Sequence, residues 1–140
     1  MPKENAFDKL SVGEELGPLQ YTITEEAIAR FAEATEDYGD WYMKDSPFGG
    51  RIAHPTLTTT DYSLMLFPKV GVFSGLHAKH ESEFYNPARL GKRMTVTAKV
   101  LEKYEKRGRE YFVLEYRTVD EDGQDIVRHR ITSSVDRVEE

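Results

Sequence analysis

Hydrophobic residues follow two different periods along the chain. In the first half they recur every three or four positions, as in an amphipathic helix. From about residue 72 they alternate with polar residues, as in a strand with one buried face. The first half therefore predicts a strand over 19–24, a helix over 25–35 that Thr24 caps, and a second helix over 55–67 that starts at Pro55.

The second half predicts four consecutive strands, at residues 74–85, 93–100, 111–119 and 126–138. Strands joined by short turns form an antiparallel sheet, and the apolar face of that sheet needs a cover. The helix over 55–67 is the element available to cover it. We expect a single α+β domain over 1–140, an antiparallel sheet wrapped around a central helix, with residues 1–18 as a loosely packed lead-in.

One sheet packed on one helix leaves a sheet edge exposed and one flank in water. Unpaired edges invite association with another chain. We therefore expect a dimer, in which a second subunit closes both surfaces.

Composition narrows the partners and the compartment. The formal net charge of −6 disfavours nucleic acid or an anionic membrane as the main partner. The chain has no cysteine, which excludes disulfides and thiolate chemistry. No apolar run approaches the ~18 residues of a membrane span, and the polar start has no signal-peptide core. We expect a cytoplasmic protein.

The histidines give no sign of a metal centre. The sequence contains 4 of them, and only His77 and His80 lie close together. On a strand, that spacing would point the two side chains to opposite faces. We expect neither a metal nor another cofactor.

The segment over 37–63 contains most of the unusual residues. The predicted loop over 36–53 is longer than most connections, and long ordered loops are often functional. The first free amides of the predicted helix, beginning at Thr56, would favour negative charge. Titratable side chains lie on both sides of the helix start, at Asp37, Asp40, Tyr42, His54 and Asp61. We expect the functional site here.

This segment resembles the MaoC-like, (R)-specific enoyl-CoA hydratase/dehydratase family, which has the hot-dog fold. The family motif is Asp-x-Asn-Pro-x-His, followed after a Gly/Pro corner by Ile-Ala-His-Gly. Here the two parts read DYGDWY over 37–42 and RIAHP over 51–55, and YNPARLG over 85–91 precedes an alternating strand as in the family. The resemblance covers nearly the whole chain.

The resemblance implies syn addition of water to an enoyl thioester, or the reverse reaction. Asp37 takes the position of the catalytic Asp, and Tyr42 takes the position of the catalytic His. A tyrosine with a reference pKa of about 10 can donate a proton at neutral pH but is a poor base. His54 is a candidate substitute for the missing histidine.

The substrate-binding residues follow from the same resemblance. Pro55 replaces the family's glycine and has no N–H, so the Thr56 amide is the candidate contact for the enolate oxygen. Ser63 falls near a helix position that can support the carboxylate. Trp41 lies beside the expected site and indicates a bulky acyl group.

Each candidate also has a structural interpretation. Asp37 could be a loop carboxylate that accepts from backbone amides. Tyr42 could pack with Trp41 beneath the loop, and His54 could cap the helix.

Three functions follow. The first is a hydratase or dehydratase acting on an enoyl or 3-hydroxyacyl thioester that is linked to CoA or a carrier protein. The second is a non-catalytic hot-dog subunit that shapes the acyl pocket of a heteromeric dehydratase. The third, an acyl-CoA thioesterase, ranks lowest because such sites use a carboxylate on the central helix, where only Asp61 is available.

Overall fold

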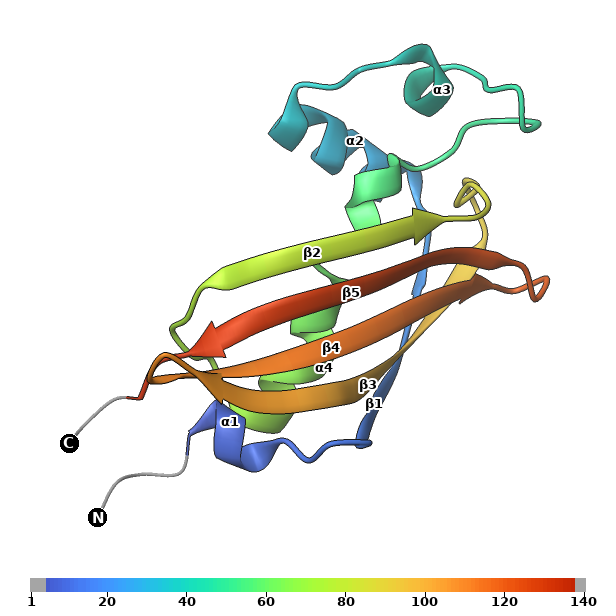
Figure 1. Ribbon diagram of the computed structural model, residues 1–140. Helices are drawn as coiled ribbons and strands as arrows, with labels where there is room; N and C mark the ends of the chain where they lie inside the picture. The colour runs from blue at the N-terminus through green and yellow to red at the C-terminus, as the bar shows by residue number, and fades with distance from the viewer. Residues whose placement is uncertain (1–4, 138–140) are drawn as a thin grey trace.

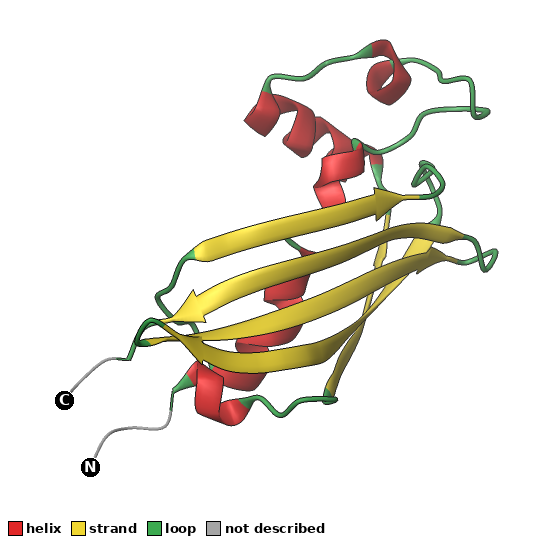
Figure 2. Ribbon diagram, in the orientation of Figure 1, coloured by secondary structure: helices red, strands yellow, loops and turns green. Residues whose placement is uncertain are grey.

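A five-stranded antiparallel sheet curls around one helix. The computed structural model describes residues 5–137. The strands are ordered β1-β3-β4-β5-β2 in the sheet, with helix α4 (Asp61–Val70) across its concave face (Figures 1 and 2). The strands are β1 (Glu15–Thr22), β2 (His77–Phe84), β3 (Arg93–Lys106), β4 (Arg109–Asp120) and β5 (Asp125–Val135). The predicted antiparallel sheet around a central helix is confirmed.

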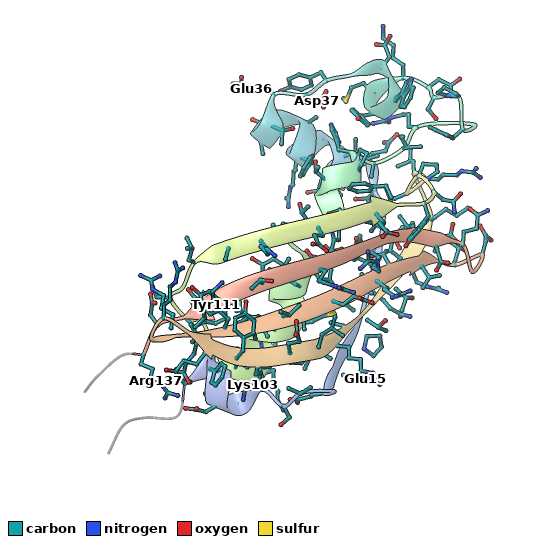
Figure 3. The ribbon with its side chains drawn as sticks, viewed as in Figure 1. Glu15, Glu36, Asp37, Lys103, Tyr111 and Arg137 are labelled. Carbon is teal, nitrogen blue, oxygen red and sulfur yellow. The ribbon has the colours of Figure 1, made fainter. Side chains whose placement is uncertain are left out.

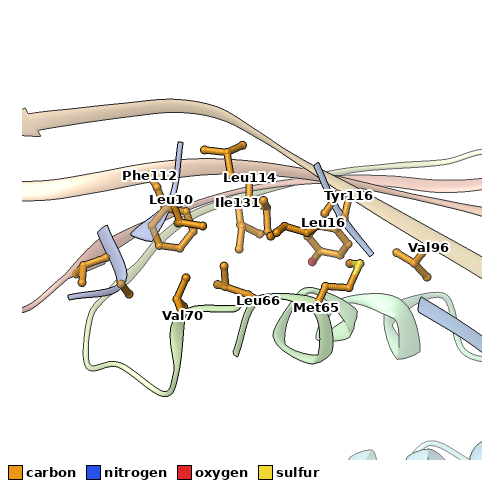
Figure 4. Packing of buried hydrophobic residues seen from close by; sticks show 14 residues of the cluster. Leu10, Leu16, Met65, Leu66, Val70, Val96, Phe112, Leu114, Tyr116 and Ile131 are labelled. Carbon is orange, nitrogen blue, oxygen red and sulfur yellow. The ribbon is translucent and has the colours of Figure 1, made fainter. Parts of the chain in front are cut away.

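Helix α4 packs into the main hydrophobic core. Its residues Met65, Leu66 and Val70 are buried against side chains from β3, β4 and β5, among them Tyr116 and Ile131 (Figure 4). Leu66 is fully buried. Burying one such side chain stabilises the fold by about 1.5–3 kcal/mol, so the apolar stripe of α4 fixes its position on the sheet.

The predicted helix over 55–67 is wrong in its bounds. A 3₁₀ turn, η1 (Pro55–Thr58), comes first, and α4 begins only at Asp61. The Thr58 hydroxyl donates to the carbonyl of Pro55 at 3.1 Å, and the Thr59 hydroxyl donates to that of Thr56. Such local bonds compete with α-helical pairing. The helix then runs on to Val70 through Pro68, past the predicted end.

Residues 5–18 are better ordered than predicted. Residues Ala6–Lys9 form helix α1, closed by a capping box in which Asn5 and Asp8 each accept from the other's backbone N–H. Leu10 is buried in the core. The expectation of a loose lead-in over 1–18 is therefore wrong for residues 5–18, and residues 1–4 lie outside the described residues. The sequence missed α1 because one helical turn has too few apolar positions to show a period. The strand predicted over 19–24 begins at Glu15, and a bulge follows Leu16.

The remaining strand predictions hold with shifted ends. β2 is shorter than predicted and β3 runs further, to Lys106. The predicted end of the last strand, Val138, lies outside the described residues. The expectation that His77 and His80 face opposite ways is wrong. A bulge between His77 and Lys79 brings His77 Nε2 to 3.1 Å from His80 Nδ1.

Helix α4 also holds a buried carboxyl group. Asp61 is only 6% exposed, and it accepts a hydrogen bond of 2.7 Å from the Tyr21 hydroxyl. Burial raises the pKa of Asp61 to about 6, although the bond from Tyr21 opposes the rise. The raised pKa means that the folded state disfavours the ionised form. Stability is therefore lost as the pH rises from about 4 to about 6 and stays low above that range.

We predict that Asp61→Asn increases the free energy of unfolding at pH 7.5 by about 1 kcal/mol, because it removes a buried charge and keeps an acceptor for Tyr21. The gain should vanish at pH 4, where Asp61 is protonated. Urea unfolding at both pH values measures it, with the exposed Asp40→Asn as the control. A variant less stable than the parent at pH 7.5 would contradict this account.

Candidate active site

A cavity of about 250 Å³ lies beside η1, between the loop over 36–53 and the ends of β2 and β5. Most of its walls are apolar. Its aromatic residues are Trp41, Tyr42, Phe48, Phe84 and Tyr85, and its buried polar side chains are His54 and Thr58. A small apolar cavity with few polar groups is the usual form of a ligand site.

The orientation of His54 is fixed by a backbone carbonyl. The side chain is 2% exposed, and its Nε2 lies 2.9 Å from the carbonyl oxygen of Asp37. A carbonyl can only accept, so Nε2 carries the hydrogen and a neutral ring has its lone pair on Nδ1. Nδ1 is buried and has no hydrogen-bond partner within the described residues. A buried acceptor without a partner is unusual and calls for an explanation.

Tyr42 lies against the imidazole. It comes from the single-turn helix α3 (Asp40–Met43), and its ring stacks on that of His54 with centroids 3.7 Å apart. Phe31, from α2 (Glu25–Thr35), contacts His54 at 4.9 Å. Burial, and then the nearby carboxylate of Asp37, raises the pKa of Tyr42. The phenol is therefore protonated at neutral pH.

The carboxylate of Asp37 does not line the cavity. Asp37 follows the end of α2, where its side chain is exposed (Figure 3). Its Oδ1 accepts from the Gly39 amide at 3.2 Å, and its carbonyl is the acceptor for His54. Asp37 is not among the residues that line the cavity. It reaches the site through its backbone oxygen and through the effect of its charge on Tyr42.

The other candidates divide in the same way. Trp41 lines the cavity and meets Phe48 edge to face at 5.6 Å, and Pro55 also lines it. Thr56 is exposed. It lies in the short 3₁₀ turn η1, so its amide does not belong to the start of the longer helix α4. Ser63 lies off the cavity, where its hydroxyl donates to the Thr60 carbonyl at 2.7 Å.

Two polar residues of this region were not predicted. Thr58 is buried in the cavity wall, and its Oγ1 lies 2.8 Å from Nε2 of the fully buried His129. His129 has the same parity as Val127 and Ile131 on β5, so strand alternation could have placed it on the buried face.

Metal and membrane features can be checked for residues 5–137. Within that range no three His, Asp or Glu side chains are grouped so that they could hold a metal ion. None of the helices between residues 5 and 137 is long and apolar enough to cross a membrane.

Comparison with known families identifies the class of the protein. Residues 11–129 match the model for the FAS1-like, dehydratase domain region. The chain belongs to this family of dehydratase-related domains. A search of curated proteins found no match.

Solved structures confirm the hot-dog fold. The R-hydratase PhaJ1 from Pseudomonas aeruginosa superposes with a TM-score of 0.78 and 21% identity, over 94% of this chain and 86% of that one. The MaoC-like dehydratase from Rhodospirillum rubrum gives 0.75 and 21%, over 95% and 97%. The HadBC (3R-hydroxyacyl-ACP dehydratase) complex from Mycobacterium tuberculosis gives 0.73 and 16%, over 90% and 98%.

We predict that His54→Phe destabilises the fold by about 1–2 kcal/mol. Phenylalanine keeps the ring stack but leaves the Asp37 carbonyl without its donor. Urea unfolding of the variant measures this loss. Tyr38→Phe, which removes an exposed hydroxyl from the same loop, is the control and should change stability by less than about 0.5 kcal/mol. Equal stability of His54→Phe and the parent would show that the bond to Asp37 does not hold the loop.

Proposed function

We propose that the protein is a cytoplasmic hydro-lyase that hydrates an enoyl thioester or dehydrates a 3-hydroxyacyl thioester, with CoA as the carrier. One observation carries the proposal. His54 lines an apolar cavity in a chain of the hydratase/dehydratase family, and its Nδ1 is a buried acceptor with no partner. An imidazole held in one tautomer, beside space for a substrate, is suited to proton transfer.

In this scheme His54 both removes and returns one proton. Nδ1 takes a proton from water while the water oxygen bonds to C3 of the enoyl thioester, and the C2=C3 electrons move toward the thioester oxygen. The resulting enolate oxygen accepts a hydrogen bond from the Thr56 amide. His54 then gives its proton to C2 on the same face, which makes the addition syn and restores the neutral ring. Dehydration follows the same steps in reverse.

The other residues orient the reactants. The Tyr42 phenol, protonated at neutral pH, donates a hydrogen bond to the water or hydroxyl oxygen. Its stacking at 3.7 Å from His54 favours a shared role. The family resemblance assigns the base to Asp37. The exposure of that carboxylate leads us to give it a positioning role instead, through its bond to His54.

The cavity favours a compact acyl group. Trp41, Phe48 and Phe84 line it, and its volume is about 250 Å³. Aromatic walls of this kind complement a branched or ring-bearing acyl chain better than a long flexible one. Pro55 is part of the cavity wall. Ser63 lies outside the cavity on the first turn of α4, where it supports the helix start through its bond to the Thr60 carbonyl.

The active form that we propose is a dimer, with a second copy or another hot-dog subunit. Strand β2 is a sheet edge, and seven of its eight residues are exposed. An unpaired edge of this length is a template for pairing with another strand. Light scattering of the purified chain should give twice the mass of 16.1 kDa. A monomer at micromolar concentration would contradict the homodimer and leave the heterodimer as the form to test.

We predict that His54→Gln lowers kcat/KM for crotonyl-CoA or a bulkier enoyl-CoA by about 10²–10⁴-fold, the usual contribution of a general acid or base. Asp37→Asn should lower it less than about tenfold, because asparagine keeps the backbone carbonyl that holds His54. Hydration is followed by the loss of enoyl absorbance. Full activity of His54→Gln would overturn the scheme, and abolished activity of Asp37→Asn would return the role of base to Asp37.

A second candidate function is that of a non-catalytic subunit. Two observations favour it: a tyrosine stands at position 42, where the family motif has histidine, and the carboxylate of Asp37 is exposed. The chain alone would then be inactive. It would raise the activity of a second hot-dog subunit that carries an intact motif, and the two would purify together.

A thioesterase ranks third. Asp61 is the carboxylate at the start of α4, and it is buried against Tyr21 and does not line the cavity. Release of free thiol from an acyl-CoA, without hydration of the enoyl-CoA, would support this alternative.

A further inference from the structure

Three of the four histidines form a hydrogen-bonded chain that the proposed mechanism does not use. His77 Nε2 lies 3.1 Å from His80 Nδ1, and His80 Nε2 lies 3.1 Å from His129 Nδ1. His129 Nε2 lies 2.8 Å from Thr58 Oγ1. His77 and His80 are exposed on edge strand β2, His129 is fully buried on β5, and Thr58 lines the cavity. The chain therefore connects solvent at the sheet edge with the cavity wall.

Local geometry builds this chain. The bulge in β2 brings His77 onto the same side as His80. Ser82 and Tyr116 are the cross-strand partners of His129, on β2 and β4. The Ser82 hydroxyl lies 2.7 Å from His129 Nδ1, and the ring of Tyr116 lies 4.7 Å from that of His129. Strand pairing thus holds His129 in place on both sides.

The hydrogens along the chain have one consistent direction. The Thr58 hydroxyl donates to the Pro55 carbonyl, so its oxygen accepts from His129 Nε2–H. Nδ1 of His129 is then an acceptor, and its one lone pair is shared between the Ser82 hydroxyl at 2.7 Å and His80 Nε2–H at 3.1 Å. Nδ1 of His80 accepts in turn from His77 Nε2–H. His80 and His129 are neutral in this order, because a second proton on either ring would place an N–H on the nitrogen that now accepts.

We propose that this chain is a pH-sensitive lock that ties edge strand β2 to the cavity through Thr58, and that acidification releases both. The part that concerns ligand binding rests on the proposed function, because it takes the cavity to be the acyl site. The part that concerns β2 depends only on the hydrogen bonds.

Within residues 5–137, the hydrogen-bond partners of the three rings carry no negative charge that would stabilise an added proton. The polar neighbours of the three rings are other imidazoles, the hydroxyls of Ser82 and Thr58, and nearby phenols. Tyr62 from α4 lies 5.8 Å from the ring of His77 and 5.7 Å from that of Tyr116. Burial, and then Tyr62 and Asp61, raises the pKa of Tyr116, the phenol beside His129. Within residues 5–137, no carboxylate pairs with an imidazole of the chain.

The direction of the pH effect follows from burial. Burial, and then His80, lowers the pKa of His129 to about 4. The part of the His80 side chain that packs beside His129 is partly buried, and this burial, and then His77, lowers the pKa of His80. Unfolded histidines take up protons near pH 6.5, where these folded ones do not. The lock is intact above about pH 6.5 and is lost as the pH falls from there toward 4. Asp61 acts in the opposite direction over part of this range, so variants are needed to separate the two.

The test compares the full-length parent with His80→Gln, which replaces an exposed, titrating member with a neutral one. Lys79→Gln, the adjacent residue on β2, is the matched control. Amide hydrogen exchange of β2 and imidazole NMR are recorded from pH 4.5 to 8. The dissociation constant of butyryl-CoA, a saturated ligand that cannot react, is measured over the same range.

In the parent and in Lys79→Gln, exchange-competent opening of β2 should increase as the pH falls below 6.5, by up to about tenfold per pH unit for each proton taken up. The signals of His80 and His129 should change together, and butyryl-CoA should bind more weakly. In His80→Gln the transition should move to lower pH. Identical profiles for His80→Gln and the parent would overturn the proposal, as would imidazoles that titrate independently near pH 6.5.

The two proposals fail differently. Absence of enoyl-CoA turnover at every pH would remove the proposed function and leave the exchange and NMR results to decide on the lock. A normal rate of turnover with a pH-independent β2 would remove the lock alone.

Discussion

The burial of α4 against the curled sheet is the constraint on which the rest of the molecule depends. Met65, Leu66 and Val70 fix the axis of the helix against Tyr116 and Ile131. The segment before the helix runs beside the ends of β2 and β5. That path brings η1 and His54 under the loop and encloses the cavity between them. The site forms because the apolar stripe of α4 has to pack against the sheet, and the polar residues of the site lie at the edge of that packed surface.

At this site, one backbone carbonyl determines which nitrogen of the His54 imidazole can accept a proton. The carbonyl of Asp37 takes the hydrogen of His54 Nε2 and leaves Nδ1 as an acceptor. The stacked ring of Tyr42 limits rotation of the imidazole, and burial keeps the phenol protonated. A buried acceptor and a protonated phenol therefore belong to two stacked residues that both line an apolar cavity, where electrostatic interactions are stronger than in water. The proposed hydratase chemistry needs both the acceptor and the donor. The need for a donor also accounts for a tyrosine at position 42.

Sequence reasoning predicted the fold well, because alternation and helical period both report burial. The sheet, the helix over 25–35 with Thr24 as its cap, and the central helix all follow from such patterns. The 3₁₀ turn before α4 was missed, because it depends on which carbonyls the threonine hydroxyls reach. The bulge in β2 was missed for a similar reason. An extra residue in a strand has no periodic signature, and it reversed the prediction for His77 and His80.

The candidate site was predicted as a region more reliably than as a set of atoms. The sequence motif indicated Asp37, Tyr42 and His54, and they do lie near one another. Which atom of each faces the cavity depends on the path of the loop, and the loop leaves the carboxylate of Asp37 out of the cavity lining, where it accepts from the Gly39 amide. Thr58 and His129 come from distant segments, so only the folded structure brings their side chains together.

The central claim is that His54 Nδ1 is the proton acceptor of the cavity. A crystal structure with a bound 3-hydroxyacyl-CoA tests it most directly. The account predicts that the 3-hydroxyl oxygen, or the water that replaces it, lies about 2.6–3.2 Å from Nδ1, while Nε2 keeps its bond to the carbonyl of Asp37. An acyl group bound outside the cavity, or a 3-hydroxyl held by the Asp37 carboxylate and remote from His54, would contradict the account.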